Sequence, residues 1–273
     1  MAAQPVTLIT QASAGIGAAL AWIFAGHGHD VFVVAPSALD LNALADDIAA
    51  AGHKRPFILA LDLLRADATV RIEHELRERG LEAQYVVNRA DFCPPGDDAA
   101  FDRAHRLAVI DVNVRALTDL SLRFVDSVAR HRGGILNIVT VAAFLPGPGG
   151  AVCHAAQAYV LSFTEALHRE LAPRGIRVTA LCTALSPPQR AEPLAQLHSA
   201  HSSARSEIGD LDGVTRAAMP FARAGYEGLM RGRRLIVPGL KHKVIAALPR
   251  LLPRRLVLDI ARSGWIRGRK SDT

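Results

Sequence analysis

The sequence predicts an α/β fold in which a parallel sheet lies between two layers of helices. Short runs rich in Val, Ile and Leu alternate along the chain with segments whose apolar residues follow helical spacing. Each run is almost continuously apolar, which is typical of strands buried on both faces. Of the 273 residues, 50% are hydrophobic and only 21% are charged, so the chain can bury a sizeable core.

The elements follow one another in a regular order. The first strand, VTLIT, leads through a small-residue turn into the apolar segment GAALAWIFAG, and the later helices are amphipathic. The predicted strands cover 6–10, 30–35, 57–63, 85–88, 135–142 and 176–182. The predicted helices cover 17–26, 40–51, 68–80, 101–131 and 152–172, and Gly80, Gly133-Gly134 and Pro173 end three of them. Short connections between such elements predict a doubly wound, Rossmann-type sheet.

We expect one domain over residues 1–230 and a C-terminal extension, 231–273, that packs on it. Residues 186–212 are polar and rich in Pro and Ser. They are expected to pass over the carboxyl ends of the strands, where ligands of such sheets bind.

The net charge of +6 is concentrated in the extension. Residues 231–273 hold twelve Lys and Arg against Asp259 and Asp272, so the rest of the chain sums to −4. Two interpretations stay open: a segment that contacts anionic lipid, or a subdomain whose apolar face covers the cleft or a subunit contact. No motif for specific nucleic-acid binding accompanies this charge.

The cysteines and histidines are scattered without the spacing of a metal site. The N-terminus does not resemble a signal peptide, and no apolar run approaches the roughly 18 residues that a membrane span needs. We therefore expect a cytoplasmic protein, with a membrane-peripheral location as the alternative. In that compartment Cys93, Cys153 and Cys182 are expected to be free thiols.

The turn after the first strand, TQASAGIG, opens a helix with Gly15 and Gly17. Backbone N–H groups in such a turn can hold a pyrophosphate, and Ser13 could add a hydroxyl. Close packing of the helix on the strand explains two glycines equally well.

With these motifs in view, nearly the whole chain resembles the short-chain dehydrogenase/reductase family. T-x-x-x-x-G-I-G is similar to its first turn, and LDL at 61–63 is similar to the end of its third strand. VVNRAD resembles its N-N-A-G segment, DVNVRALTDL its fourth helix, and ILNIVTVAAFLPGPGGAV its fifth strand and loop.

The resemblance implies a nicotinamide cofactor, NAD(P), and a homodimer or homotetramer paired through helices 101–131 and 152–172. It implies an adenine contact at Asp62. The positions it assigns to the cofactor are Gln11, Ser13, Gly15, Ile16, Gly17, Asp62 and Asn88.

The catalytic positions of the family are altered. Its proton-donating Tyr corresponds to Cys153, and the Lys that tunes this Tyr corresponds to Gln157, one helical turn later. Its Ser corresponds to Thr140, which keeps a hydroxyl, and its Asn is kept as Asn113.

The cofactor positions have changed as well. Gln11 replaces the first glycine of the turn, and Pro36-Ser37 stands where an acid or an Arg would hold the ribose. Asp91 replaces the glycine of N-N-A-G, and Thr183-Ala184 replaces a Pro-Gly pair. Binding of NAD(P) is therefore doubtful.

These changes favour a pseudoenzyme that works in binding, scaffolding or regulation, with a protein partner or a small ligand in the cleft. The alternative is an atypical NAD(P)-dependent oxidoreductase, or a non-redox enzyme, rebuilt around Thr140, Cys153 and Asn113. A nucleophilic Cys153 with His154 as its base is disfavoured, because adjacent helical residues point about 100° apart. A buried Arg89–Asp91 ion pair that fills the cleft is a further hypothesis.

Overall fold

The computed structural model describes residues 3–89, 92–93, 103–183, 213–253 and 255–259. Within these residues, seven parallel strands form one sheet in the order β3-β2-β1-β4-β5-β6-β7. The strands are β1 Gln4–Thr10, β2 Val31–Ala35, β3 Phe57–Ala60, β4 Leu81–Arg89, β5 Gly134–Thr140, β6 Arg177–Thr183 and β7 Leu235–Ile236. This order confirms the predicted fold class, a doubly wound parallel sheet.

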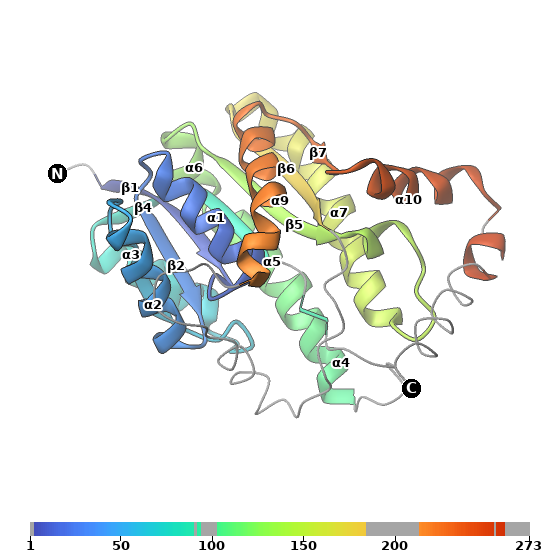
Figure 1. Ribbon diagram of the computed structural model, residues 1–273, viewed down its shortest axis with the longest axis horizontal. Helices are drawn as coiled ribbons and strands as arrows, with labels where there is room; N and C mark the ends of the chain where they lie inside the picture. Colours follow the sequence, from blue (N-terminus) through green and yellow to red (C-terminus); the bar gives the residue numbers. More distant parts are fainter. Residues whose placement is uncertain (1–2, 90–91, 94–102, 184–212, 254, 260–273) are drawn as a thin grey trace.

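Helices cover both faces of the sheet (Figure 1). On one face pack α1 Gly15–Gly26, α2 Ala38–Ala50 and α9 Gly213–Met230. On the other pack α3 Ala68–Glu78, α5 Leu117–Arg123, α6 Val125–Arg130 and α7 Ala151–Leu171. The remaining helical elements are α4 Arg103–Ile110, η2 Asp111–Ala116, η3 Val141–Phe144, η4 Ala172–Arg174 and α10 Leu240–Leu251. The two faces bury separate apolar cores, and a third, smaller apolar cluster packs η3 and α7 against the carboxyl ends of β5 and β6.

One predicted helix is not continuous. In place of a single helix over 101–131, α4 leads into the π-helical turn η2, then α5, and non-helical torsion angles at Phe124 separate α5 from α6. The extra residue of a π-turn rotates the side chains after it, and such turns are common at functional sites. Asn113 lies in η2 and is fully buried.

Strand ends differ from the prediction by a few residues. β4 begins at Leu81 rather than at residue 85, because its first residues pair with the start of β1 before a register shift. β3 ends at Ala60 and β5 at Thr140, where turn and 3₁₀ structure take over. The two-residue β7 was not predicted; it pairs with Ala180 and Leu181 of β6.

The domain boundary at residue 230 stays a prediction. The predicted excursion, 186–212, and the last part of the extension lie outside the described residues. Of the extension, α10 is described and contacts η3. Among the described residues, no helix combines the length and apolarity that a membrane crossing requires.

At the amino end of the sheet, His29 lies against three aromatic rings. Its ring is 5.2 Å from those of Phe24 and Tyr85, and its Nε2 is 3.3 Å from the hydroxyl of Tyr226. Burial, followed by the charges of His27 and Arg177, lowers the pKa of His29 below its usual 6.5, and Asp30 opposes the shift. The folded protein therefore resists protonating this ring.

We expect the free energy of unfolding to decrease as the pH falls below about 6.5, because the unfolded chain then takes up a proton that the folded His29 resists. About one pH unit above that value His29 is almost entirely neutral in both states, and its contribution to the slope fades. Urea unfolding at pH 7.5 and pH 5.5 measures this, and H29Q should reduce the loss. H74Q, at an exposed position of α3, serves as the control; an equal reduction there would contradict the assignment to His29.

Candidate functional site

The candidate site lies at the carboxyl ends of β1, β4 and β5, beside the first turns of α1 and α7. Parallel strands bring these ends to one edge of the sheet, which is where ligands of doubly wound folds bind. Thr140 ends β5, Arg89 ends β4, and Cys153 lies in the first turn of α7.

The turn between β1 and α1 keeps a tight backbone. Gln11 and Gly15 have left-handed torsion angles, with φ of 50° and 61°. A Cβ atom on Gly17 would lie 2.5 Å from the carbonyl oxygen of Gln11, so only glycine fits there. Ile16 is buried in the core beneath the turn. Close packing of α1 on β1 therefore accounts for Gly17 without any ligand.

Other parts of the protein already contact this turn. The N–H of Gly15, at the start of α1, donates to the hydroxyl of Thr215 at 2.9 Å. Thr215 is buried near the start of α9, two hundred residues along the chain. On the other side, Nη1 of Arg89 lies 3.4 Å from the carbonyl oxygen of Gln11 and 3.5 Å from that of Ala14. The turn is thus contacted from both α9 and β4.

Two other positions that the resemblance assigns to a cofactor, Asn88 and Asp62, also make contacts within the protein. The amide of Asn88 donates to Ser121 and to Asn137, each at 3.0 Å, in the buried centre of the sheet. A carboxylate oxygen of Asp62 accepts from the N–H of Leu64 at 2.9 Å. Ser13 is half-buried. Asp91 and Ala184 lie outside the described residues. The hypothesised Arg89–Asp91 ion pair therefore involves a residue that is not described.

The hydroxyl of Ser37, after β2, is also engaged. It accepts the N–H of Asp40 at 3.2 Å and thereby caps α2. In the described structure this hydroxyl stabilises a helix end, which is a structural role.

Gln157 forms a direct link between α7 and β5. Its side-chain oxygen accepts the backbone N–H of Thr140 at 2.8 Å, and both residues are buried. The hydroxyl of Thr140 in turn accepts the N–H of Ala142 at 3.3 Å. A protonated lysine cannot accept a hydrogen bond. Gln157 therefore accepts the N–H of Thr140 at a position where the lysine implied by the resemblance could not.

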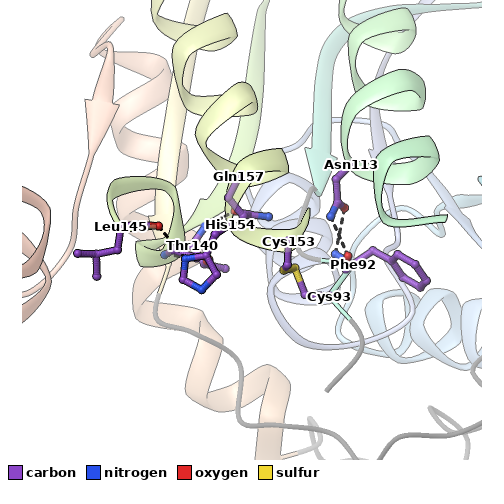
Figure 2. Close-up of a disulfide and its surroundings, with 9 residues drawn as sticks. Phe92, Cys93, Asn113, Thr140, Leu145, Cys153, His154 and Gln157 are labelled. Atoms are coloured by element: carbon purple, nitrogen blue, oxygen red, sulfur yellow. Dashed lines mark hydrogen bonds between the residues drawn. A yellow bond between two sulfur atoms is a disulfide. The ribbon is translucent and has the colours of Figure 1, made fainter. Parts of the chain in front are cut away.

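Cys153 is joined to Cys93 by a disulfide, with the two Cα atoms 5.7 Å apart (Figure 2). The prediction of free thiols is therefore wrong for these two cysteines. Sixty residues separate them, but the topology places the segment after β4 beside the first turn of α7. Cys182 is free and fully buried, and burial raises the pKa of its thiol to about 12.

Asn113 holds the same segment from the other side. Its side-chain oxygen accepts the N–H of Phe92 at 3.1 Å, and its amide donates to the carbonyl oxygen of Phe92 at 2.7 Å. Figure 2 shows the disulfide between this clamp and the Thr140–Gln157 pair. Nδ1 of His154 lies 2.8 Å from the carbonyl oxygen of Leu145, the residue after η3. The imidazole ring thus contacts the backbone at this point.

The structure thus brings Thr140, Cys153, Gln157 and Asn113 to one place. It adds Phe92, Cys93 and Thr215, which the sequence did not single out. Three scattered cysteines were visible, but nothing in their spacing indicated a pair. Within the described residues, no group of His, Cys, Asp and Glu is arranged to hold a metal ion.

Comparison with known proteins places this chain in a family. Residues 5–196 match the family model described as short chain dehydrogenase. The chain is 26% identical to 17-beta-hydroxysteroid dehydrogenase type 3 of Rattus norvegicus, over 91% of this chain and 76% of that protein. It is 32% identical to an uncharacterized oxidoreductase of Myxococcus xanthus, over 64% of this chain and 69% of that protein. A short-chain dehydrogenase from Sphingobium yanoikuyae, solved with NADPH, superposes with a TM-score of 0.70 at 27% identity, covering 96% of this chain and 95% of that one.

Proposed function

Because this chain belongs to the short-chain dehydrogenase family, we propose that its site has been converted from hydride transfer to binding, so that the protein acts as a pseudoenzyme. The observation that carries the proposal is the state of the two positions where the resemblance puts Tyr and Lys. Cys153 is held in a disulfide, and the side-chain oxygen of Gln157 accepts the backbone N–H of Thr140. Neither offers a proton donor or a positive charge to a substrate.

The residues present do not fit NAD(P) as the family holds it. The N–H of Gly15, which faces the pyrophosphate in such folds, is taken up by Thr215, and the guanidinium of Arg89 lies against the same turn. Gln157 has no charge to place near a nicotinamide ribose. We therefore derive no reaction step through this cofactor.

The proposed ligand is a small molecule bound at the carboxyl edge of the sheet, or a protein partner that binds to the same edge. Polar groups already cluster there around Thr140, Asn113 and the disulfide. A site that keeps polar groups at this edge without an acid and a base is suited to bind a ligand rather than to transform it.

Pairing of two or four chains through the helices around α4, α5 and α7 is part of the proposal. Large apolar side chains are exposed on these helices at Leu107, Ile110, Leu122 and Tyr159. Burying such residues against a second copy would remove them from water. Contact of the extension with anionic lipid is supported by the exposed Val244 and Ile245 of α10, next to basic residues.

Titration of the protein with NADH and NADPH by calorimetry, followed by a screen of carbonyl substrates, tests the proposal. We expect no turnover, because loss of a general acid alone lowers rates by about 10²- to 10⁴-fold. Micromolar binding together with turnover, reduced in a T140V variant, would instead support an oxidoreductase rebuilt around Thr140, Cys153 and Asn113.

A further inference from the structure

The three described cysteines differ sharply in their surroundings. Cys93 and Cys153 both keep part of their surface exposed, whereas Cys182 is fully buried within strand β6. Thiol–disulfide exchange requires that an incoming thiolate reach one of the two sulfurs. The accessible pair meets this condition, and Cys182 does not.

The two sulfurs of the bridge are not equivalent. Cys153 lies in the first turn of α7, a helix of 21 residues, where the partial positive charge of the helix end favours a thiolate. Cys93 follows β4 on a segment outside any helix. An exchange reaction proceeds faster when the sulfur that leaves is the better-stabilised thiolate. Attack at Cys93, with Cys153 leaving, is therefore the favoured direction.

The bridge also crosses the candidate site. On one side of it lie Thr140 and Gln157, and on the other lies Asn113 with the backbone of Phe92 (Figure 2). It ties the segment after β4 to α7 at the position where the resemblance puts the family's reactive side chain. When the bridge is intact, that position holds two sulfur atoms and no free thiol.

We propose that Cys93 and Cys153 form a reversible thiol–disulfide exchange site, whose substrates are low-molecular-mass thiols and which opens the candidate site when reduced. The regulatory half of this statement rests on the proposed ligand-binding function. The exchange chemistry itself does not.

The reaction balances with two thiols. The first, as a thiolate, attacks Sγ of Cys93; the bond between the two cysteines breaks, and Cys153 leaves as a thiolate. A second thiolate attacks the outer sulfur of the mixed disulfide on Cys93, which leaves in turn. The two thiols are oxidised to one disulfide, and two electrons and their protons pass to the cysteines.

Reduction changes what holds the segment after β4. In the oxidised form Cys93 is covalently fixed to α7, and Phe92 is held by Asn113. These are three links: one disulfide and two hydrogen bonds to Asn113. In the reduced form only the two hydrogen bonds remain. Local opening becomes easier when a cross-link is lost, so the amides of Phe92 and Cys93 should exchange with solvent faster.

The test equilibrates the whole protein in buffers with different ratios of reduced glutathione to glutathione disulfide. Each sample is quenched with acid, alkylated and weighed by mass spectrometry. We expect the pair to pass from bridged to two alkylated thiols within the range of ratios that glutathione can set, while Cys182 stays unlabelled until the protein is unfolded. A pair that remains bridged, or remains reduced, at every ratio overturns the proposal.

Hydrogen exchange supplies the second readout. The amides of Phe92 and Cys93 should exchange about tenfold or more faster after reduction, and should be equally fast in C153S without reductant. C182A is the matched control, in which the redox response should persist. If the redox midpoint is found but exchange is unchanged, the site does not open and the regulatory half fails. Turnover with NADPH would refute the proposed function and leave the exchange measurement standing.

Discussion

A C93A variant is expected to unfold with a free energy about 4 kcal/mol lower than the wild-type protein under non-reducing conditions. The bridge closes a loop with a sequence separation of 60 residues, and it stabilises by restricting the unfolded chain. For a domain whose total stability is about 5–15 kcal/mol, this is a large fraction. Urea unfolding with and without a reducing agent measures the difference.

The two cysteines together provide their own control. C93A, C153A and the double variant should all lose the same amount, because each removes the same cross-link. Adding reductant should bring the wild-type protein down to the level of the variants. Losses that add in the double variant would mean that packing of the side chains, and not the cross-link, carries the stability.

A Q157K variant is expected to lose about 3–5 kcal/mol of unfolding free energy, since it buries an unpaired charge. Gln157 is fully buried, and its side-chain oxygen accepts the N–H of Thr140. Lysine offers only donors, so the N–H of Thr140 loses this acceptor while an ammonium group enters the core. The result bears on function, because lysine is the residue that the resemblance puts at this position.

A Q157M variant separates the two effects of the substitution. Methionine is similar in length and uncharged, so it removes the hydrogen-bonding amide without adding a charge, at about 1–3 kcal/mol. The further loss in Q157K should shrink as the pH rises toward 10, because a buried ammonium gives up its proton more easily. If Q157K proved as stable as wild type at pH 7, the site would still accept the family's lysine, and the atypical oxidoreductase would regain support.

Both variants address the same question about the site. The bridge and the Gln157–Thr140 hydrogen bond lie at the two positions where the resemblance puts reactive side chains. A site built in this way gains rigidity where an enzyme of this family needs a proton donor. For this reason we place binding, under thiol control, ahead of hydride transfer.

Local pattern alone determined the fold class and the resemblance to the family. Each buried strand is a short run of Val, Ile and Leu, and that signal lies within a few neighbouring residues. The same holds for α7, which the spacing of its apolar residues predicted to within one residue. The turn motifs that resemble short-chain dehydrogenases are also local.

Tertiary structure alone decided which residues contact one another at the site. The break between α5 and α6 at Phe124 and the pairing of β7 with β6 depend on packing partners elsewhere in the chain. The Cys93–Cys153 bridge and the contact of Thr215 with Gly15 join residues 60 and 200 positions apart. Spacing along the chain carries no signal for such pairs, because the order of strands in the sheet, and not distance in sequence, brings them together.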